Sequence, residues 1–295
     1  MSVSTLSFKE SDVSAYVGVK ETAICVVNSA GAVVLEASAE TAVGAIHQAL
    51  EGYARRLRRV GHEAGALSPW LHRGLQRLGL EVVLLEIRHV HAALKVQRNK
   101  TDRNDAPGLA QLVRSGWYRD VHVKSDDSYR LRLLLTHRRT LKRKFLDLEN
   151  EIRHSLKVFG VKLHAAGRGS FNEQVRDAVA TDAFLAAMTE PMLRARAALW
   201  AEYTRMHALV VQITVHDAVC KRFMSIPSVG PVTALAFKTA VDAPHRFARS
   251  RNVGAHFGLT PKREQSGTSI DFDGHISRQG TRRCARCSTK PRAVC

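Results

Sequence analysis

The sequence predicts an α/β domain built on a mixed sheet, then a long helical segment and a second, mainly helical region. Two apolar, β-branched runs, 15–27 and 31–37, flank the turn sequence Asn-Ser-Ala-Gly, which is typical of a β-hairpin. Strand-like and helix-like segments then alternate, which indicates a sheet covered by helices. From residue 128 apolar residues recur at spacings of three and four, the pattern of a long helix.

The first domain is predicted to alternate between helices and strands. We expect a helix at 40–59, a strand at 59–65, a helix at 67–79, a buried strand at 80–86, a helix at 87–96 and a further helix within 98–118. The helix at 67–79 has a Ser-Pro start and a Gly stop, the usual punctuation of a helix.

The second half is predicted to be helical. A helix at 128–159 would end at Gly160, and further helices are expected at 172–188 and 191–219. The segment 226–237, "IPSVGPVTALAF", resembles the hairpin of helix-hairpin-helix modules, whose backbone N–H groups bind DNA phosphates, here around Gly230. The predicted division is 15–125, an α/β domain; 126–220, a helical connector; 221–280, a C-terminal domain; and 281–295, a basic tail.

Charge points to a polyanionic partner. Lys and Arg total 45 against 27 Asp and Glu, a net charge of +18. Neutralising phosphates releases counterions, so nucleic acid is the first candidate and an anionic membrane surface the rival. There is no apolar run of about 18 residues and no N-terminal signal sequence, so we expect a soluble, intracellular protein.

The five cysteines are scattered, which is typical of reduced thiols rather than a disulfide framework. Cys284 and Cys287 form a single CxxC pair. A zinc site normally needs a second ligand pair, so we interpret this one as chance.

Three acidic residues could hold a divalent cation. Asp102 and Asp105 lie three apart, on one face of the expected helix, and Glu63 ends a predicted strand. Mg²⁺ prefers such oxygen ligands and assists phosphodiester cleavage. Spacing alone favours the ordinary alternative, in which the aspartates cap a helix and Glu63 is a solvated loop residue.

Longer stretches carry a specific resemblance. The segment 58–125 contains "VGHEAGALSPWL" and "KTDRNDA", and the second half contains "SIPSVGPVTALAF", "GLTPKREQSG" and "DGHISRQG". In this order they closely resemble the DEDD, RuvC-like transposases of bacterial insertion sequences, a group related to the Piv invertases. The matches cover most of 16–280.

The resemblance implies an RNase H-like domain with four acidic ligands for Mg²⁺, a coiled-coil connection, and a domain with a nucleophilic serine. Glu63, Asp102 and Asp105 match three of the four acids, as catalytic and metal-binding residues. Ser266 matches the serine that would attack the DNA phosphate, with Ser277 as the second choice. Without the resemblance Ser266 would be an ordinary turn residue.

The resemblance also implies partners: DNA, an element-encoded guide RNA and further copies of the chain, in the bacterial cytoplasm at the nucleoid. Several residues are candidates for nucleic-acid contact: Lys100, Arg103, Arg138, Arg139, Lys142, Arg143, Lys144, Gly230 and Arg278. For the five on the long helix the alternative is a solvated helix face.

The sequence departs from the family pattern at its first acid. Family members carry an aspartate on the first strand, whereas here Gly18 leads to Lys20 as though a short segment were deleted. Asp12 is expected to precede the strand, and Glu21 would be a weak substitute. Because that aspartate typically bridges two metal ions in RNase H-like sites, its loss predicts an impaired metal site.

Two further departures concern the fold. Pro107 is expected in the first turn of its helix, where it is tolerated but could rotate Asp105 relative to Asp102. After Gly280 the chain loses apolar periodicity, which we interpret as a frameshift. We therefore expect a degenerate transposase with little activity. The alternatives are a non-catalytic nucleic-acid-binding remnant and a RuvC-like junction nuclease without a serine step.

Overall fold

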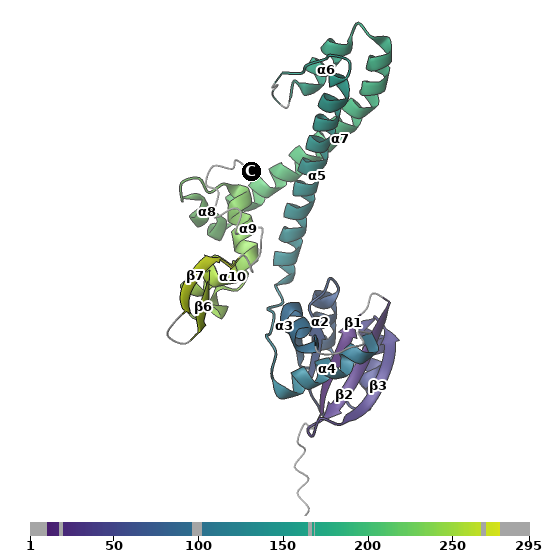
Figure 1. The fold of residues 1–295 in the computed structure, drawn as a ribbon, viewed down its shortest axis with the longest axis vertical. Coiled ribbons are helices and arrows are strands. Elements are labelled where there is room, and N and C mark those ends of the chain that lie inside the picture. The colour runs from purple at the N-terminus through teal and green to yellow at the C-terminus, as the bar shows by residue number, and fades with distance from the viewer. Residues whose placement is uncertain are drawn as a thin grey trace, which may run out of the picture. The chain divides into compact units, whose positions relative to one another are not determined.

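The computed structural model of the chain divides into two compact units, Met1–Lys124 and Ser125–Cys295 (Figure 1). It describes residues 11–17, 20–95, 102–164, 167, 169–266 and 270–277, without the side chains of 11–17, 102–104, 264–266 and 270–273. The expected connector and C-terminal domain lie within the same second unit. In the described part of the chain, no helix has both the length and the hydropathy needed to cross a bilayer.

The first unit contains a five-stranded sheet. Its strands are β1 (Ser11–Val17), β2 (Glu21–Asn28), β3 (Val33–Glu40), β4 (Leu57–Glu63) and β5 (Val82–Leu85), in the order β3-β2-β1-β4-β5. The first three strands are antiparallel, while β4 pairs parallel with β1 and β5 parallel with β4. This mixed sheet is RNase H-like, which confirms the predicted fold class.

Helices cover both faces of this sheet (Figure 1). They are α1 (Val43–Leu50), α2 (Ser68–Arg77), α3 (Ile87–Leu94) and α4 (Asp102–Ser115). Alternation along β2 separates the faces: Ile24 and Val26 pack in one core with α1 and α2, and Cys25 and Val27 in another with α4. Below, the second of these is called the α4 face.

The N-terminal prediction was wrong in its strand count. The run 15–27 was taken as one strand, but it holds the end of β1 and most of β2, which pair with each other as a hairpin. Asp12 therefore lies inside the sheet, opposite Val27, and not ahead of it. The polar segment 11–14 has little strand signal of its own, and becomes a strand by pairing with both β2 and β4.

The helix expected at 40–59 was also wrong in length. Glu40 ends β3, and α1 stops at Leu50. Turns follow from Glu51, and Leu57 already belongs to the buried strand β4. Gly52 is unfavourable inside a helix, and Leu57, which had suggested a longer helix, belongs to β4.

The second unit is built on two long helices, α5 (Asp126–Lys157) and α7 (Ala183–His216), which lie side by side (Figure 1). The remaining elements are α6 (Phe171–Val179), α8 (Ala218–Met224), α9 (Pro231–Val241), η1 (Pro244–Arg246), α10 (Arg251–His256), β6 (Pro261–Ser266) and β7 (Ile270–Ile276). Buried residues of α5, α7, α8 and α9 form one core, so the expected connector shares its core with the first helices of the expected C-terminal domain.

The long helix expected at 128–159 is confirmed as α5. The Ser125 hydroxyl accepts the Ser128 N–H at 3.2 Å and caps its start, and Gly160 has a φ of 76° just after its end. The division between 188 and 191 was wrong, because α7 continues through Pro191. The interruption lies earlier, where the Asp182 carboxylate accepts the Leu185 N–H and begins α7.

A buried ion pair joins α5 to α7. Arg196 and Glu149 are 2% and 4% exposed, and the Arg196 Nε donates to Glu149 Oε1 at 3.1 Å. The Asn172 side chain accepts from the same guanidinium at 3.3 Å. Since a buried charge without a counter-charge is costly, the two residues depend on each other.

A buried histidine makes the first unit sensitive to acid. His62, in β4, has no exposed surface and lies 6.2 Å from the His72 ring, centroid to centroid. Burial, and then the proximity of His72, lowers the pKa of His62 from 6.5 to about 4. Between these values the unfolded chain binds a proton that the folded chain does not, so stability falls as pH falls.

Replacing Glu149 by Leu should destabilise the second unit by about 3–5 kcal/mol, because Arg196 then remains buried and charged. The double variant Glu149→Leu/Arg196→Met should recover most of this loss, because it removes both charges and keeps apolar volume. Urea unfolding followed by far-ultraviolet circular dichroism measures both. Equal loss in the single and double variants would contradict the argument.

Lowering pH from 6.5 towards 4 should cost the first unit up to about 3 kcal/mol through His62. His62→Leu should remove this part of the pH dependence, whereas His47→Leu, on half-exposed α1, should leave it unchanged. Hydrogen exchange of β4 and β5 peptides in the full chain, corrected for intrinsic rates, measures the effect. An unchanged slope in His62→Leu would show that other groups cause the acid sensitivity.

Candidate active site

The direction of α4 decides which residues meet. At its end, Gln111 donates to the Gly31 carbonyl at 2.7 Å and Arg114 to the Ser29 carbonyl at 3.2 Å, so α4 ends at the β2–β3 turn. Its start therefore lies near the beginning of β2. Because β2 is antiparallel to β1, and β4 is parallel to β1, this is also the carboxyl end of β4.

Close packing fixes α4 against β4. A Cβ added to Gly61 would lie 2.2 Å from Cγ2 of Val113, so only glycine allows this approach. Gly61 therefore lies on the α4 face. Glu63, two residues further on, lies on the same face at the end of the strand.

Asp105 lies on the buried side of α4 and is 3% exposed. It shares a helical stripe with Leu109 and Leu112, which pack in one core with Leu85 of β5. Asp105 is one turn before Leu109, at the start of the helix. Glu63 and Asp105 thus share one face and one edge of the sheet, while the side chain of Asp102 is outside the described residues.

Glu63 is held by neighbours that the sequence analysis did not single out. Its Oε1 lies 3.4 Å from Nε2 of His91 in α3, and its side chain is 13% exposed. The Ser68 hydroxyl donates to the Glu63 carbonyl at 2.8 Å and accepts the Gly65 N–H at 2.7 Å, which fixes the loop after β4. The only signal for His91 was its place on the helix that follows a buried strand.

The register of β1 shows which of its residues is level with Glu63. Ala15 pairs with His62, so Tyr16 is level with Glu63, and Tyr16 also pairs with Ala23 of the α4 face. Asp12 pairs with Arg59, four residues before Glu63, a separation of about 13 Å along the strand. Tyr16 therefore stands where β1 would contribute a carboxylate to this edge.

The donors present fit one Mg²⁺ better than two. Mg²⁺ is often bound through one or two carboxylates together with water and substrate phosphates, and Glu63 and Asp105 can provide the carboxylates. A pair of ions needs a bridging carboxylate, and β1 has none at the level of Glu63. Among the described side chains, no group of three His, Cys, Asp or Glu could hold a metal ion.

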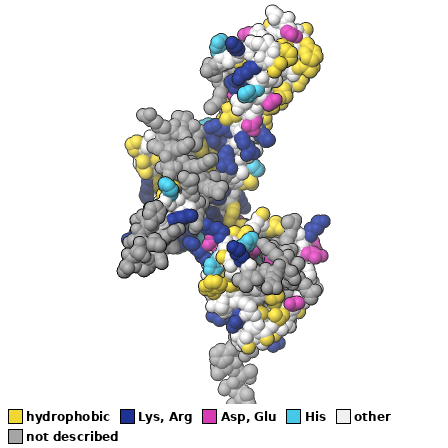
Figure 2. All heavy atoms as spheres, viewed as in Figure 1, with side chains coloured by type: hydrophobic (Ala, Val, Ile, Leu, Met, Phe, Trp, Pro, Cys, Tyr) yellow, Lys and Arg dark blue, Asp and Glu magenta, His cyan; other side chains and the backbone are white. Residues whose placement is uncertain are grey.

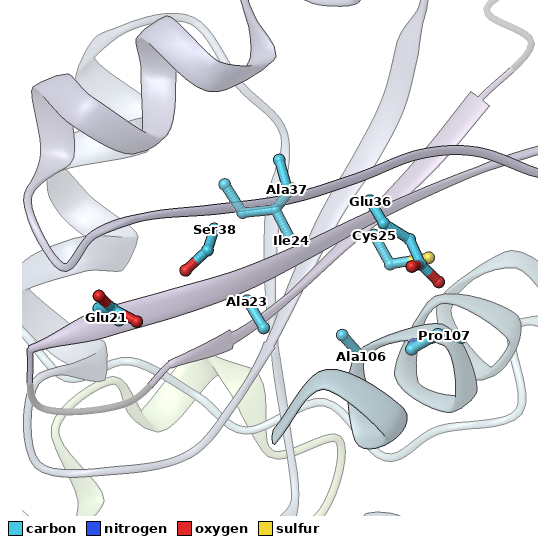
Figure 3. Close-up of a pocket in the computed structure, with 9 residues that line it drawn as sticks. All are labelled: Glu21, Ala23, Ile24, Cys25, Glu36, Ala37, Ser38, Ala106 and Pro107. Carbon is cyan, nitrogen blue, oxygen red and sulfur yellow. The ribbon is translucent and has the colours of Figure 1, made fainter. Parts of the chain in front are cut away.

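A pocket of about 390 Å³ lies beside this edge, between the β2–β3 hairpin and the start of α4 (Figure 3). Ala106 and Pro107 face Ala23 and Cys25 across it, and Glu21 lies at its margin. Burial, and then a nearby glutamate, raises the pKa of the Cys25 thiol to about 11, so the thiol is neutral at physiological pH. Glu21 is exposed and belongs to β2, so it does not fill the β1 position.

Pro107 is the sixth residue of α4, in the second turn rather than in the first as expected. The helix continues through it. The missing N–H leaves the carbonyl of Arg103 without its usual helical partner.

The structure separates the candidates for nucleic-acid contact. The prediction was wrong for Arg138, which is 3% exposed and donates to the Tyr203 hydroxyl at 2.8 Å and to His207 Nδ1 at 3.2 Å. Arg139, Arg143 and Lys144 are exposed on α5, and Lys142 is partly exposed. Figure 2 shows Lys and Arg side chains on the visible face of the two-helix segment. Lys100, Arg278 and the side chain of Arg103 are outside the described residues.

Gly230 is the N-cap of α9, and Pro231 is its first residue. With α8 and the turn between them, α9 forms a helical hairpin in which Ser228 has a φ of 69°. This agrees with the Gly-Pro turn expected at 226–237 and leaves the first N–H groups of α9 without intrahelical partners.

The two candidate serines lie at opposite ends of the β6–β7 hairpin. Ser266 is the last residue of β6 and pairs with Ile270, the first residue of β7. Ser277 follows β7, and its N–H donates to the Thr260 carbonyl at 2.8 Å. The length of β7 separates them by about 20 Å, so one bound phosphate can lie close to only one of the two serines.

A solved structure, T. thermophilus RuvC in complex with a Holliday junction substrate, matches 38% of this chain and 99% of its own length. The TM-score is 0.30 at 14% identity, so this match carries no argument about the site. The fold assignment depends instead on strand order and direction.

Curated relatives resemble more of the chain. The transposase for insertion sequence element IS1111A of Coxiella burnetii is 30% identical over 223 residues, 73% of this chain and 59% of the relative. A putative transposase, y4pF/y4sB, of Sinorhizobium fredii is 25% identical over 233 residues, 77% of this chain and 54% of the relative. The chain thus spans between half and three fifths of the length of these relatives.

Two family models match successive parts of the chain. The DEDD model of IS110 transposases matches residues 17–160, which include β2 to β5 and α4. The model described as "Transposase IS116/IS110/IS902 family" matches residues 220–287, which include α9 and the β6–β7 hairpin. The chain belongs to the IS116/IS110/IS902 family of transposases.

Proposed function

We propose that the chain acts on DNA at the ends of an insertion sequence, by strand exchange that depends on Mg²⁺. One observation carries the proposal: α4 brings Asp105 to the same face and edge of the sheet as Glu63. Two carboxylates at the edge of an RNase H-like sheet, in a chain with a net charge of +18, suit phosphodiester chemistry.

Each residue has a separate role in this proposal. Glu63 and Asp105, with Asp102, provide oxygen ligands for the cation, and His91 holds the Glu63 carboxylate in place. When bound, the cation stabilises the charge that develops on the phosphate. Exposed Arg139, Arg143 and Lys144 neutralise backbone phosphates away from the reacting bond.

Ser266 supplies the nucleophile in this proposal. Its hydroxyl oxygen attacks phosphorus, forms a serine–phosphate ester and displaces a deoxyribose oxygen. That oxygen takes a proton from water, and the serine proton passes to water. A hydroxyl of a second strand then attacks the same phosphorus and restores the serine. The support is the family match that covers Ser266, the last residue of β6.

The chain is proposed to be a weakened copy. Tyr16 occupies the β1 position level with Glu63, and Asp12 is displaced along the strand. The same observation favours the second candidate function, a transposase remnant that binds nucleic acid without cutting it. The guide RNA and the multimer remain proposals that depend on the family resemblance, with the excess of positive charge supporting a nucleic-acid partner.

Tyr16→Asp should restore a ligand at this edge. The apparent affinity for Mn²⁺, used as a spectroscopic substitute for Mg²⁺, should rise by at least about tenfold, because even outer-shell groups change metal affinity by about 10–100-fold. Paramagnetic resonance of the full chain measures bound Mn²⁺, and Mg²⁺-dependent cleavage of element-end DNA should rise with it.

Ser14→Asp is the matched control, since it adds the same charge two residues earlier on the same strand and face. It should leave Mn²⁺ affinity unchanged, and Glu63→Gln combined with Tyr16→Asp should cancel the gain. If Tyr16→Asp and Ser14→Asp behaved alike, the position assigned to the missing acid would be wrong.

In the Tyr16→Asp background, Ser266→Ala should abolish a covalent protein–DNA adduct, whereas Ser277→Ala should retain it. The adduct is measured on a denaturing gel with a nicked, labelled element end that prevents religation. Loss in Ser277→Ala alone would transfer the nucleophilic role to that residue. Cleavage that is indifferent to both changes would indicate a junction nuclease without a serine step.

A further inference from the structure

An exposed tryptophan follows α4. Trp117 is 62% exposed, and its ring meets the His89 ring of α3 edge-on at 5.1 Å and 65°. Its backbone is fixed, because Gly116 adopts a φ of 71° and the Ser115 hydroxyl accepts the Trp117 N–H at 3.3 Å. This large aromatic side chain is therefore exposed to solvent, while its backbone is fixed.

The segment that carries this tryptophan leads from the end of α4 back to the edge that carries the proposed metal ligands. Two residues beyond Trp117, the Arg119 carbonyl accepts the Glu86 N–H at 2.9 Å, and Glu86 directly follows Leu85, the β5 partner of Glu63. Helix α3 begins just after Glu86. The segment after α4 is therefore fixed to the carboxyl end of β5.

Helix α3 relates the tryptophan to Glu63. His89 contacts Trp117, and His91 contacts Glu63. Residues two apart on a helix point in nearly opposite directions, so Trp117 and Glu63 lie on opposite sides of α3. Because each lies beyond a histidine that already reaches the surface of the helix, the helix diameter and the two contacts separate them by about 20 Å. A nucleic-acid strand crosses such a distance within a few nucleotides.

The rim of this aromatic surface is basic. The side chains of Arg88 and Arg119 are 54% and 75% exposed, and both approach Glu86, whose side chain is 17% exposed. One carboxylate therefore faces two guanidinium groups, which leaves an excess positive charge beside the indole. An aromatic ring bordered by arginine is the arrangement that binds unpaired bases with their phosphates.

We propose that Trp117 is a stacking platform for an unpaired nucleobase, on a strand whose phosphates pass Arg88 and Arg119 beside the Glu63–Asp105 edge. The proposal rests on the proposed function in that the chain acts on nucleic acid, and it adds that the strand is locally unpaired there. Stacking recognises any base, so the platform supplies affinity without sequence preference.

The test is binding of the full chain to labelled oligothymidylate of about ten nucleotides, in the range of known single-strand sites, with a chelator present so that no cleavage occurs. Trp117→Ala should raise the dissociation constant by about 5- to 150-fold, the equivalent of one stacked base. Trp117→Phe should keep most of the affinity, because it retains an aromatic face. Fluorescence anisotropy measures all three proteins.

The matched control is Trp70→Ala, which removes a 48%-exposed tryptophan from α2 of the same unit and should leave affinity unchanged. An oligonucleotide of the same length without bases separates stacking from charge, and Trp117→Ala should bind it as the unaltered chain does. Oligouridylate and oligothymidylate distinguish RNA from DNA as the source of the base.

The proposal would be overturned if Trp117→Ala weakened binding of the base-free and the ordinary oligonucleotide equally. Equal weakening of single-strand and duplex binding, or unchanged single-strand binding, would also overturn it. The proposed strand exchange fails by a different measurement. A chain that binds single strands through Trp117 but never cuts with Mg²⁺ supports the platform and contradicts the activity. If Trp117→Ala changes neither cutting with Mg²⁺ nor single-strand binding, the activity is supported and the platform is contradicted.

Discussion

The close contact between α4 and the sheet is the constraint on which the site depends. Gly61, Ala106 and Ala110 have little or no side chain, so the helix can approach the strands closely. The contacts of Gln111 and Arg114 with the β2–β3 turn fix the direction of the helix. Asp105 is then necessarily delivered to the carboxyl end of β4, since the beginning of α4 has no other place to lie.

The sequence predicted the parts of this arrangement that depend on local pattern. A short strand with Glu63 near its carboxyl end and a helix beginning near Asp102 were both recognisable from local pattern. It could not predict the start of β1, whose residues 11–14 are mostly polar and acquire strand structure by pairing with two neighbouring strands. The significance of Tyr16 follows from pairing register, a long-range property that no local pattern contains.

Basic residues illustrate the same limit. Arg138 and Arg139 are adjacent in a basic run, yet the first is buried against Tyr203 and His207 of α7 and the second is exposed. Arg196 is buried with Glu149. Which face of α5 is solvated depends on where α7 packs. Composition therefore indicates that the chain has a basic surface for a polyanionic partner, but it does not identify the residues of that surface.

The residues that hold this fold together are different from those that would perform chemistry. The cores beneath α4 and beneath α1 and α2 consist of apolar and small side chains, and the acids contribute little to either. A carboxylate at an open sheet edge adds charge repulsion rather than stability when no cation is bound. In the proposed site, Tyr16 in place of an acid would therefore remove a metal ligand without weakening the sheet. A chain can belong to a transposase family through its packing and still differ from its relatives in catalysis.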